Sequence, residues 1–385
     1  MKVTNEPAAR VLARAAILFA ALSALCLLLA GCGGPAQAPA SVPASVPASV
    51  PASVPASAEV ASTVSAVDPH GVFSRALDEP YVTVTGGQFY VTWQNQTKRN
   101  VPSTTLVRAD QATGRIEAAR TFGTGYISAP QAAGGSLWAL LGSTQETLLR
   151  MNPATLAVTG RLHISDGQYL NFNGFDNHLS VAGGALWAVA GDRLVRVSLR
   201  TGQAEKVIDL PGGFSTSIAG SSSGSFLIVS VADSGGLGSM QRRDPVSGSL
   251  LASRATAGVT AATIGGIVGS GVWAAQPTGM QGFIQRYRTT TLAPVSGTAV
   301  EGSNGIGVVV ANGLAWVLRS GPGEDTSYCA NPVTGRELAA VRLPHPDLDD
   351  VIGIWGTYVY YGASAAQGDG SYLRRVTVPA TCRVG

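Results

Sequence analysis

Lysine is nearly absent from this chain, where it occurs only at Lys2, Lys98 and Lys206. Charged residues of both signs make up 13% of the sequence, and the net charge is only +3. No run of basic residues occurs outside the N-terminal leader. A surface that binds nucleic acid needs clustered lysine and arginine on one face. The sequence therefore predicts no nucleic-acid partner.

Cysteine and histidine are also scarce, with four residues of each. The chain has no Cys-x-x-Cys or His-Glu-x-x-His motif, and no Gly-x-Ser-x-Gly motif in a strand-to-helix context. These absences argue against the enzymes that carry such motifs. Catalysis is disfavoured but stays open, since some sites are assembled from distant segments.

The N-terminus has the pattern of an export signal. Lys2, Arg10 and Arg14 precede an apolar stretch at 15–30 that is too short for a comfortable membrane span. The stretch ends in Leu-Ala-Gly-Cys at 29–32, which resembles a bacterial lipobox. The resemblance implies a lipoprotein signal peptide at 1–31 and lipidation of Cys32. The alternative is an ordinary secretory leader with an incidental cysteine. The lipobox implies a lipid-anchored protein on the outer side of a bacterial cell membrane.

A strict four-residue repeat of Pro, Ala, Ser and Val follows at 39–57. Proline at every fourth position blocks helix formation and favours an extended chain. We expect residues 32–57 to form a disordered linker that spaces the folded part from the membrane. The folded domain is then expected at 58–385.

Glycine is abundant, with 48 residues, and two markers recur in step through this domain. The first marker is a turn such as "NPVTG", with steps of 42–47 residues between successive copies of its threonine or serine. These residues are Thr113, Thr155, Thr201, Ser247, Thr291, Thr334 and Thr381. The second marker is a glycine-rich turn before an apolar run such as "LWALL". Its copies begin at Gly86, Gly134, Gly183, Ser223, Ser270, Asn312 and Trp355.

Each repeat reads as four strands, and a four-stranded unit of this length is typical of a β-propeller blade. The sequence predicts an all-β, seven-bladed β-propeller. Little chain follows Thr381, so the last unit lacks an outer strand. We expect the stretch at 58–67 to supply that strand and close the ring.

The run "GGALWAV…DRLVRVSLRTGQAEKVIDLPG" resembles blades of the YVTN, virginiamycin B lyase-like and PQQ-repeat propellers. The likeness covers about 58–385. Virginiamycin B lyases of this kind use His and Glu residues with a magnesium ion. The histidines here, His70, His163, His178 and His345, stand in dissimilar contexts. Quinone-dependent propellers usually have eight blades and a calcium site, whereas seven units are counted here.

Arginine recurs just ahead of the turn in five units, at Arg108, Arg150, Arg196, Arg242 and Arg286. An anion-binding ring is one interpretation. The other is that the arginine stems pack along each blade and pair with carboxylates near the turn.

Cysteine replaces this arginine at Cys329, and Cys382 replaces the glycine of the last turn. In an oxidising compartment these two residues are predicted to form a disulfide, unless the distance between neighbouring blades is too great.

Two connections between blades gather polar and aromatic side chains. The connection at 164–180 suits a calcium site or a carbohydrate platform, with candidates Asp166, Tyr169, Asn171, Asn173, Phe175, Asp176 and His178. The connection at 343–350 contains His345, Asp347, Asp349 and Asp350, which could hold a divalent ion or form a solvated acidic turn. Calcium or magnesium is therefore possible at either connection, although no metal ligand is assigned.

The combined features favour a monomeric, membrane-anchored binding or scaffold protein for an envelope protein, a glycan or a peptide. The alternative is a metal-assisted lyase or hydrolase similar to the virginiamycin B lyase-like propellers. It requires His178 with Asp176, or His345 with Asp347, to converge with a carboxylate near the channel.

Overall fold

In a computed structural model of the chain, the residues described are 65–66, 78–95, 103–110, 115–123, 125–142, 145–166, 177–210, 213–221, 223–233, 237–256, 262–278, 281–295, 300–303, 306–319, 325–343, 351–355, 358–364 and 371–383. They belong to one compact unit, Ser57–Gly385. The predicted signal peptide, the lipidated Cys32 and the repeat linker lie outside them. The described part contains no helix with the length and apolar character of a membrane span.

The described strands form antiparallel sheets in which neighbours along the chain pair with one another. Six sheets use consecutive strands. The first three are β2 (Asp78–Thr85), β3 (Gln88–Asn95), β4 (Ser103–Ala109) and β5 (Ile116–Phe122); then β6 (Tyr126–Ile127), β7 (Gln131–Ala133), β8 (Ser136–Gly142), β9 (Glu146–Met151) and β10 (Val158–Ser165); then β11 (Leu179–Ala182), β12 (Ala185–Ala190), β13 (Arg193–Val197) and β14 (Ala204–Asp209).

The next three sheets continue the pattern. They are β15 (Gly213–Gly220), β16 (Leu227–Asp233), β17 (Gly238–Arg243) and β18 (Leu250–Ala255); then β19 (Thr263–Val268), β20 (Gly271–Thr278), β21 (Gln281–Arg288) and β22 (Val300–Ser303); then β23 (Ile306–Ala311), β24 (Leu314–Arg319), β25 (Asp325–Ala330) and β26 (Glu337–Leu343). Both β6 and β7 pair with β8, so the second sheet has five strands.

The last three strands form a composite sheet. These strands are β27 (Val351–Trp355), β28 (Tyr358–Ser364) and β29 (Ser371–Thr377), and a 3-10 turn at Ala380–Cys382 follows them. The outer position on β29 is taken by β1 (Ser65–Ala66), which lies within the stretch at 58–67 predicted for that role. The last strand of the folded unit therefore pairs with its first described strand.

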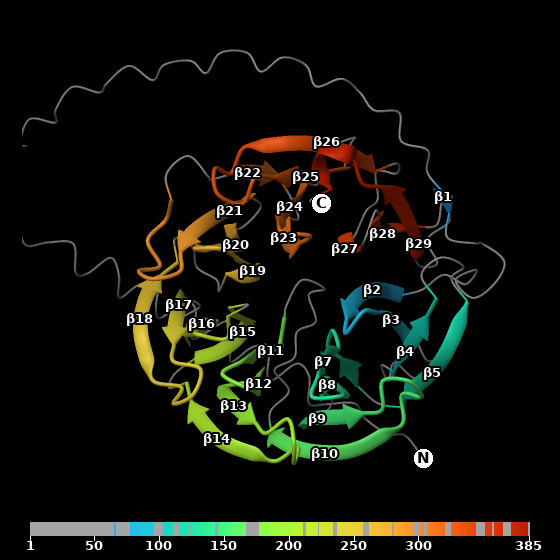
Figure 1. The fold of residues 1–385 in the computed structure, drawn as a ribbon, viewed down its shortest axis with the longest axis vertical. Coiled ribbons are helices and arrows are strands. Elements are labelled where there is room, and N and C mark those ends of the chain that lie inside the picture. The colour runs from blue at the N-terminus through green and yellow to red at the C-terminus, as the bar shows by residue number, and fades with distance from the viewer. Residues whose placement is uncertain are drawn as a thin grey trace, which may run out of the picture. The chain divides into compact units, whose positions relative to one another are not determined.

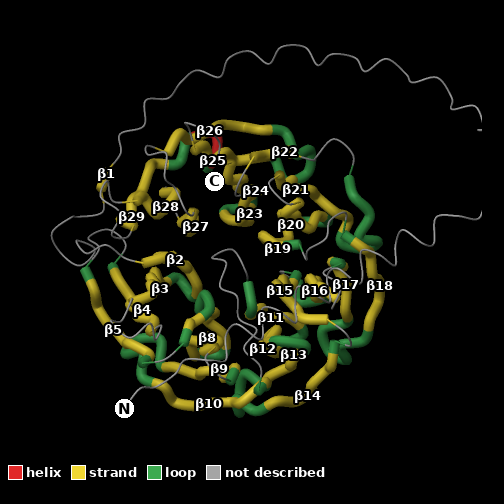
Figure 2. The backbone as a smooth tube through the Cα atoms, turned by 180° about the vertical axis from the view of Figure 1, so that it is seen from behind, coloured by secondary structure: helices red, strands yellow, loops and turns green. Residues whose placement is uncertain are grey.

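Within this unit the sheets are arranged around a ring (Figures 1 and 2). The strands nearest the centre are β2, β7, β11, β15, β19, β23 and β27, and those at the outside are β5, β10, β14, β18, β22, β26 and β1. Each hydrophobic cluster among the described residues joins two neighbouring sheets. One cluster packs Val82 and Phe89 of the first sheet against Tyr360 and Leu373 of the composite sheet. The fold is thus a β-propeller of four-stranded blades, as the repeat predicted.

Candidate functional site

Antiparallel blades have two chemically different ends. The tight turns that join first to second strands and third to fourth strands gather at one end, which we call the turn end. The connections from second to third strand, and from one blade to the next, gather at the other, which we call the loop end. Both connections singled out in the sequence are at the loop end. The contacts at the turn end hold neighbouring blades together.

The recurring "NPVTG" segments form the turns between third and fourth strands. At Asn331, the side-chain oxygen accepts hydrogen bonds of 2.9 Å from the backbone N–H groups of Val333 and Thr334. The Thr334 hydroxyl then accepts the N–H of Arg336 at 3.3 Å. Asparagine and aspartate are favoured here because their side chains satisfy backbone donors inside the turn. The same hydrogen bonding at Asn152 and Asp244 explains why Asn or Asp recurs at the start of these turns.

The residue after the threonine has positive φ, which glycine adopts without steric cost. Gly248 has a φ of 70°, yet leucine occupies the same place at Leu156 (58°) and Leu292 (56°). Both leucines are fully buried. Leu156 lies in a cluster with Tyr90 of the preceding blade, and Leu292 lies in a cluster with Ile228. The turn residue therefore packs against the blade before it.

At two junctions glycine lies beside a tryptophan of the preceding blade. A Cβ atom on Gly248 would overlap Ile208 and lie only 3.1 Å from Cη2 of Trp187. A Cβ atom on Gly202 would lie 3.5 Å from Cη2 of Trp138. At the Trp187 junction, glycine thus leaves the space that Ile208 and the indole fill. At the Tyr90 and Ile228 junctions, a leucine occupies the corresponding place.

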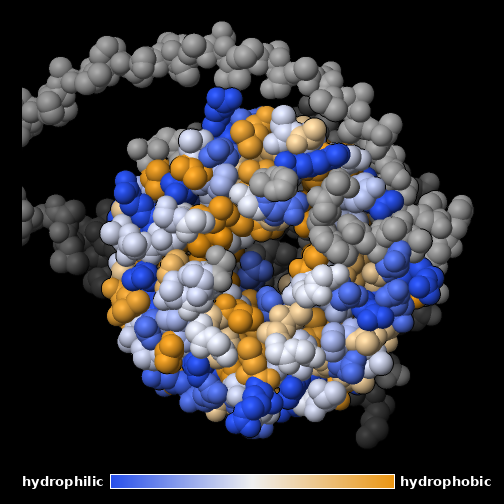
Figure 3. All heavy atoms as spheres, in the orientation of Figure 1, coloured by the Kyte–Doolittle hydropathy of each residue, from blue (hydrophilic) through white to orange (hydrophobic). Residues whose placement is uncertain are grey.

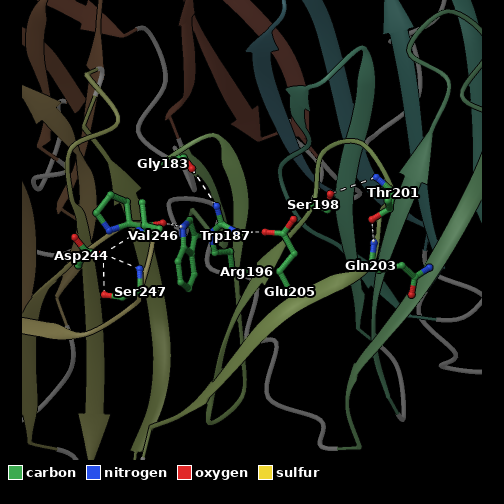
Figure 4. A network of polar contacts seen from close by, with 11 residues as sticks. Gly183, Trp187, Arg196, Ser198, Thr201, Gln203, Glu205, Asp244, Val246 and Ser247 are labelled. Atoms are coloured by element: carbon green, nitrogen blue, oxygen red, sulfur yellow. Dashed lines mark hydrogen bonds and ion pairs between the residues drawn. The ribbon is translucent and has the colours of Figure 1, made fainter.

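Hydrogen bonds fix the same junction (Figure 4). The indole N–H of Trp187 donates to the carbonyl of Pro245 in the next blade at 3.1 Å. Gly183 (φ 56°) lies so close to Pro245 that a Cβ atom would be 2.6 Å from the proline carbonyl oxygen. Tyr90 makes the equivalent bond to Pro153 at 3.4 Å. The turn end is therefore built of interblade contacts.

The recurring arginines make contacts within their own blades. Arg196 donates to the carbonyl of Gly183 at 3.1 Å and pairs with Glu205 on the outer strand (Figure 4). Arg108 pairs with Glu117 at 3.0 Å. Arg150 and Arg242 lie over the rings of Trp138 and Phe226, with 5.4 and 5.1 Å to the ring centres. The stems therefore pack along the blades, as in the second interpretation given for them.

The predicted disulfide between Cys329 and Cys382 is confirmed, with Cα atoms 5.9 Å apart. Cys329 pairs with Trp316 across the strands, in the register that Arg150 keeps with Trp138. Arg150 packs near Gly202 of the next turn, and Cys382 stands in that glycine's place. At the last junction, the disulfide therefore replaces by a covalent bond the contact that Arg150 and Gly202 make by packing.

The predicted loop-end site is described only at its two edges. Asp166 is exposed and lies 3.1 Å from the imidazole of His163. His178 has only 5% of its surface exposed, and its backbone carbonyl accepts the N–H of Val189 at 2.9 Å. Burial lowers the pKa of His178 to about 4, so its ring is neutral at pH 7. His178 therefore belongs to the packed interior.

The other candidates lie outside the described residues. They are Tyr169, Asn171, Asn173, Phe175, Asp176, His345, Asp347, Asp349 and Asp350. In the part of the chain that the structure describes, no three His, Cys, Asp or Glu side chains gather as a metal site would require.

An exposed apolar surface, which the sequence did not bring to attention, lies on the outer strands of two blades. Exposed fractions are 52% for Val207 on β14, 62% for Val246 in the turn before β18, and 52% and 47% for Leu250 and Leu251 on β18. Figure 3 shows hydrophobic side chains at the outside of the ring over β18. In the sequence, the exposed apolar surface is indicated only by the segment "LLASRA" of β18, which has no acidic residue.

Comparison with solved structures supports the architecture. BamB from Moraxella catarrhalis matches with a TM-score of 0.50 and 11% sequence identity, over 77% of this chain and 84% of that one. The chain shares the propeller fold. At this identity, the likeness concerns the fold alone. No protein-family model and no curated protein sequence matches this chain.

Proposed function

We propose that this protein is a lipid-anchored propeller at the outer side of a bacterial membrane, where it binds an envelope protein and acts as a scaffold. In this proposal the composite sheet of β1 and β27–β29 serves as the seventh blade. Cys32 carries the lipid, and the proline-rich linker spaces the ring from the membrane.

The observation that carries the proposal is the exposed apolar surface on the outer strands of blades β11–β14 and β15–β18. Large apolar side chains gathered on an exposed surface are typical of a protein–protein interaction site. The interblade contacts at the turn end hold this surface on a rigid frame, which lowers the entropy that binding would cost. The BamB from Moraxella catarrhalis, a bacterial protein, shares the fold.

Crosslinking on intact cells, followed by purification through a C-terminal tag and mass spectrometry, tests the binding role. We expect reproducible capture of one or two envelope proteins. A variant with residues 169–176 replaced by Gly and Ser tests the loop end, and it must stop before the buried His178. No capture above background by the native protein would refute the scaffold role.

The anchor has its own test. Cells fed an alkyne fatty acid should label the native protein but not a Cys32→Ser variant, and the variant should leave the membrane fraction. Equal labelling of both proteins would refute lipidation at Cys32.

A further inference from the structure

The outer strands β14 and β18 are packed less than β5 and β10, and in β14 every residue except Ile208 is exposed. In β5 and β10 the residues alternate between exposed and partly buried along most of the strand. In β18 every residue except Ala252 is exposed. A strand that is exposed on both faces and at its edge has the geometry to accept another strand.

The backbone groups that point away from the blade can be assigned. Thr256 donates its N–H to the carbonyl of Gly238 at 2.9 Å, and Ala255 stands opposite Ser239. Hydrogen-bonded pairs alternate along an antiparallel ladder. Arg254 therefore bonds toward β17, while the N–H and C=O groups of Ser253 and Ala255 point outward. These outward groups form the edge available to a partner.

Charge does not protect this edge. Outer strands usually carry charged residues that discourage pairing with another chain. Acidic residues are present on the outer strands β5 and β14, as Glu117 on the first and Glu205 and Asp209 on the second. On β18 the only charge is that of Arg254, beside the exposed Leu250 and Leu251. The edge is thus apolar and cationic.

The protein itself provides a precedent for strand addition at the outside of the ring. The short strand β1 comes from a distant part of the chain and pairs antiparallel with β29 at Ser65 and Ala66. All strand pairs in the described residues are antiparallel. An added strand on β18 would continue the same pattern.

We propose that the edge of β18 binds an extended segment of the partner protein as an additional antiparallel strand. The segment is apolar at alternate positions, so that its apolar face packs beside Leu251 on one face of β18. It carries a carboxylate that pairs with Arg254. This inference rests on the proposed protein-binding function and names its surface.

The test uses the full chain purified in detergent and a fluorescent probe peptide. The probe alternates valine and threonine and has one glutamate. A matched probe has lysine in place of the glutamate. Fluorescence anisotropy measures both affinities. Ser253→Pro removes one outward N–H without touching the bonds to β17, a change that edge strands tolerate. Ser253→Ala, which keeps the N–H, is the control.

We expect Ser253→Pro and Leu251→Ser each to weaken the glutamate probe by about tenfold, which is the scale of one lost hydrogen bond or buried side chain. Ser253→Ala should stay within about twofold. Arg254→Glu should reverse the preference between the probes. The melting temperature of each variant shows whether it has folded.

Failure of the native protein to bind the glutamate probe, or equal binding by folded Ser253→Pro, would overturn this inference. In cells, undiminished capture of the envelope partner by Ser253→Pro would also overturn it, while the scaffold function would stand. Absence of capture by the native protein would instead refute the scaffold function itself.

Discussion

At blade junctions in this ring, a side chain on the second strand of one blade packs against the turn of the next blade. If the two side chains share a fixed volume, a pair of substitutions should show it. Trp187 faces Gly248, whereas Ile228 faces Leu292 at the following junction. Replacing Trp187 by isoleucine and Gly248 by leucine would copy the second arrangement into the first. Each single change should be costly, and the pair should cost less than their sum.

The magnitudes follow from the contacts. Trp187→Ile loses buried volume, worth about 2 kcal/mol, and the hydrogen bond to Pro245, worth about 1 kcal/mol. Gly248→Leu places a side chain at a φ of 70°, which costs about 1 kcal/mol. It also overlaps Ile208 and crowds Trp187, at about 2 kcal/mol. Independent effects would thus sum to about 6 kcal/mol.

In the double variant the leucine fills the space left by the indole. We expect only the crowding against Trp187, about half of the overpacking, to disappear, because the overlap with Ile208 remains. The loss should therefore be about 5 kcal/mol and the coupling about 1 kcal/mol. Urea unfolding followed by far-UV circular dichroism measures each free energy. The control pair, Trp187→Ile with Leu292→Gly, changes two different junctions and should be additive. Coupling below about 0.5 kcal/mol in the test pair would refute the shared-volume reasoning.

Other expectations concern the last junction and two titrating groups. Cys329→Ala with Cys382→Ala should lower the free energy of unfolding by about 4 kcal/mol, from the sequence separation of 53 residues. In urea unfolding, Cys329→Arg with Cys382→Gly should recover part of this loss. Equal stability of the two double variants would contradict the equivalence of the disulfide with the arginine–glycine contact of other junctions. At His178, the unfolded chain binds a proton below about pH 6.5 but the folded protein only below about 4. The free energy of unfolding should therefore fall by roughly 3 kcal/mol as pH drops through this window, and His178→Gln should flatten the profile; an unchanged profile would count against the buried ring. Hydrogen bonds from Ser247 lower the pKa of Asp244, so Ser247→Ala should raise it in an NMR titration, whereas an unchanged value would show that the hydroxyl has no part.

The blades could be predicted from sequence because their information is local. Alternating apolar runs, the Asx turn at Asn331 and the glycine at Gly248 each depend on residues close along the chain. Their repetition gave the four-stranded unit and its period. The strand β1, which takes the outer position on β29, lies within the stretch predicted for that role.

The candidate site was harder to read because it depends on exposure. His178 looked like one member of a polar surface loop, yet it is buried. Leu250 and Leu251 are large apolar residues of a strand, yet both are exposed. Residue type and spacing predict which face of a strand is apolar, but not whether another element covers that face.

The sequence by itself thus determined the blade, its turns and the cysteine pair that could be bonded. Only the tertiary structure decided which side chains meet across a junction, since Trp187 and Gly248 are brought together by the stacking of two blades. It also decided that β18 remains uncovered. The physical reason is that turns and strands are stabilised by neighbours in the chain, whereas burial depends on neighbours in space.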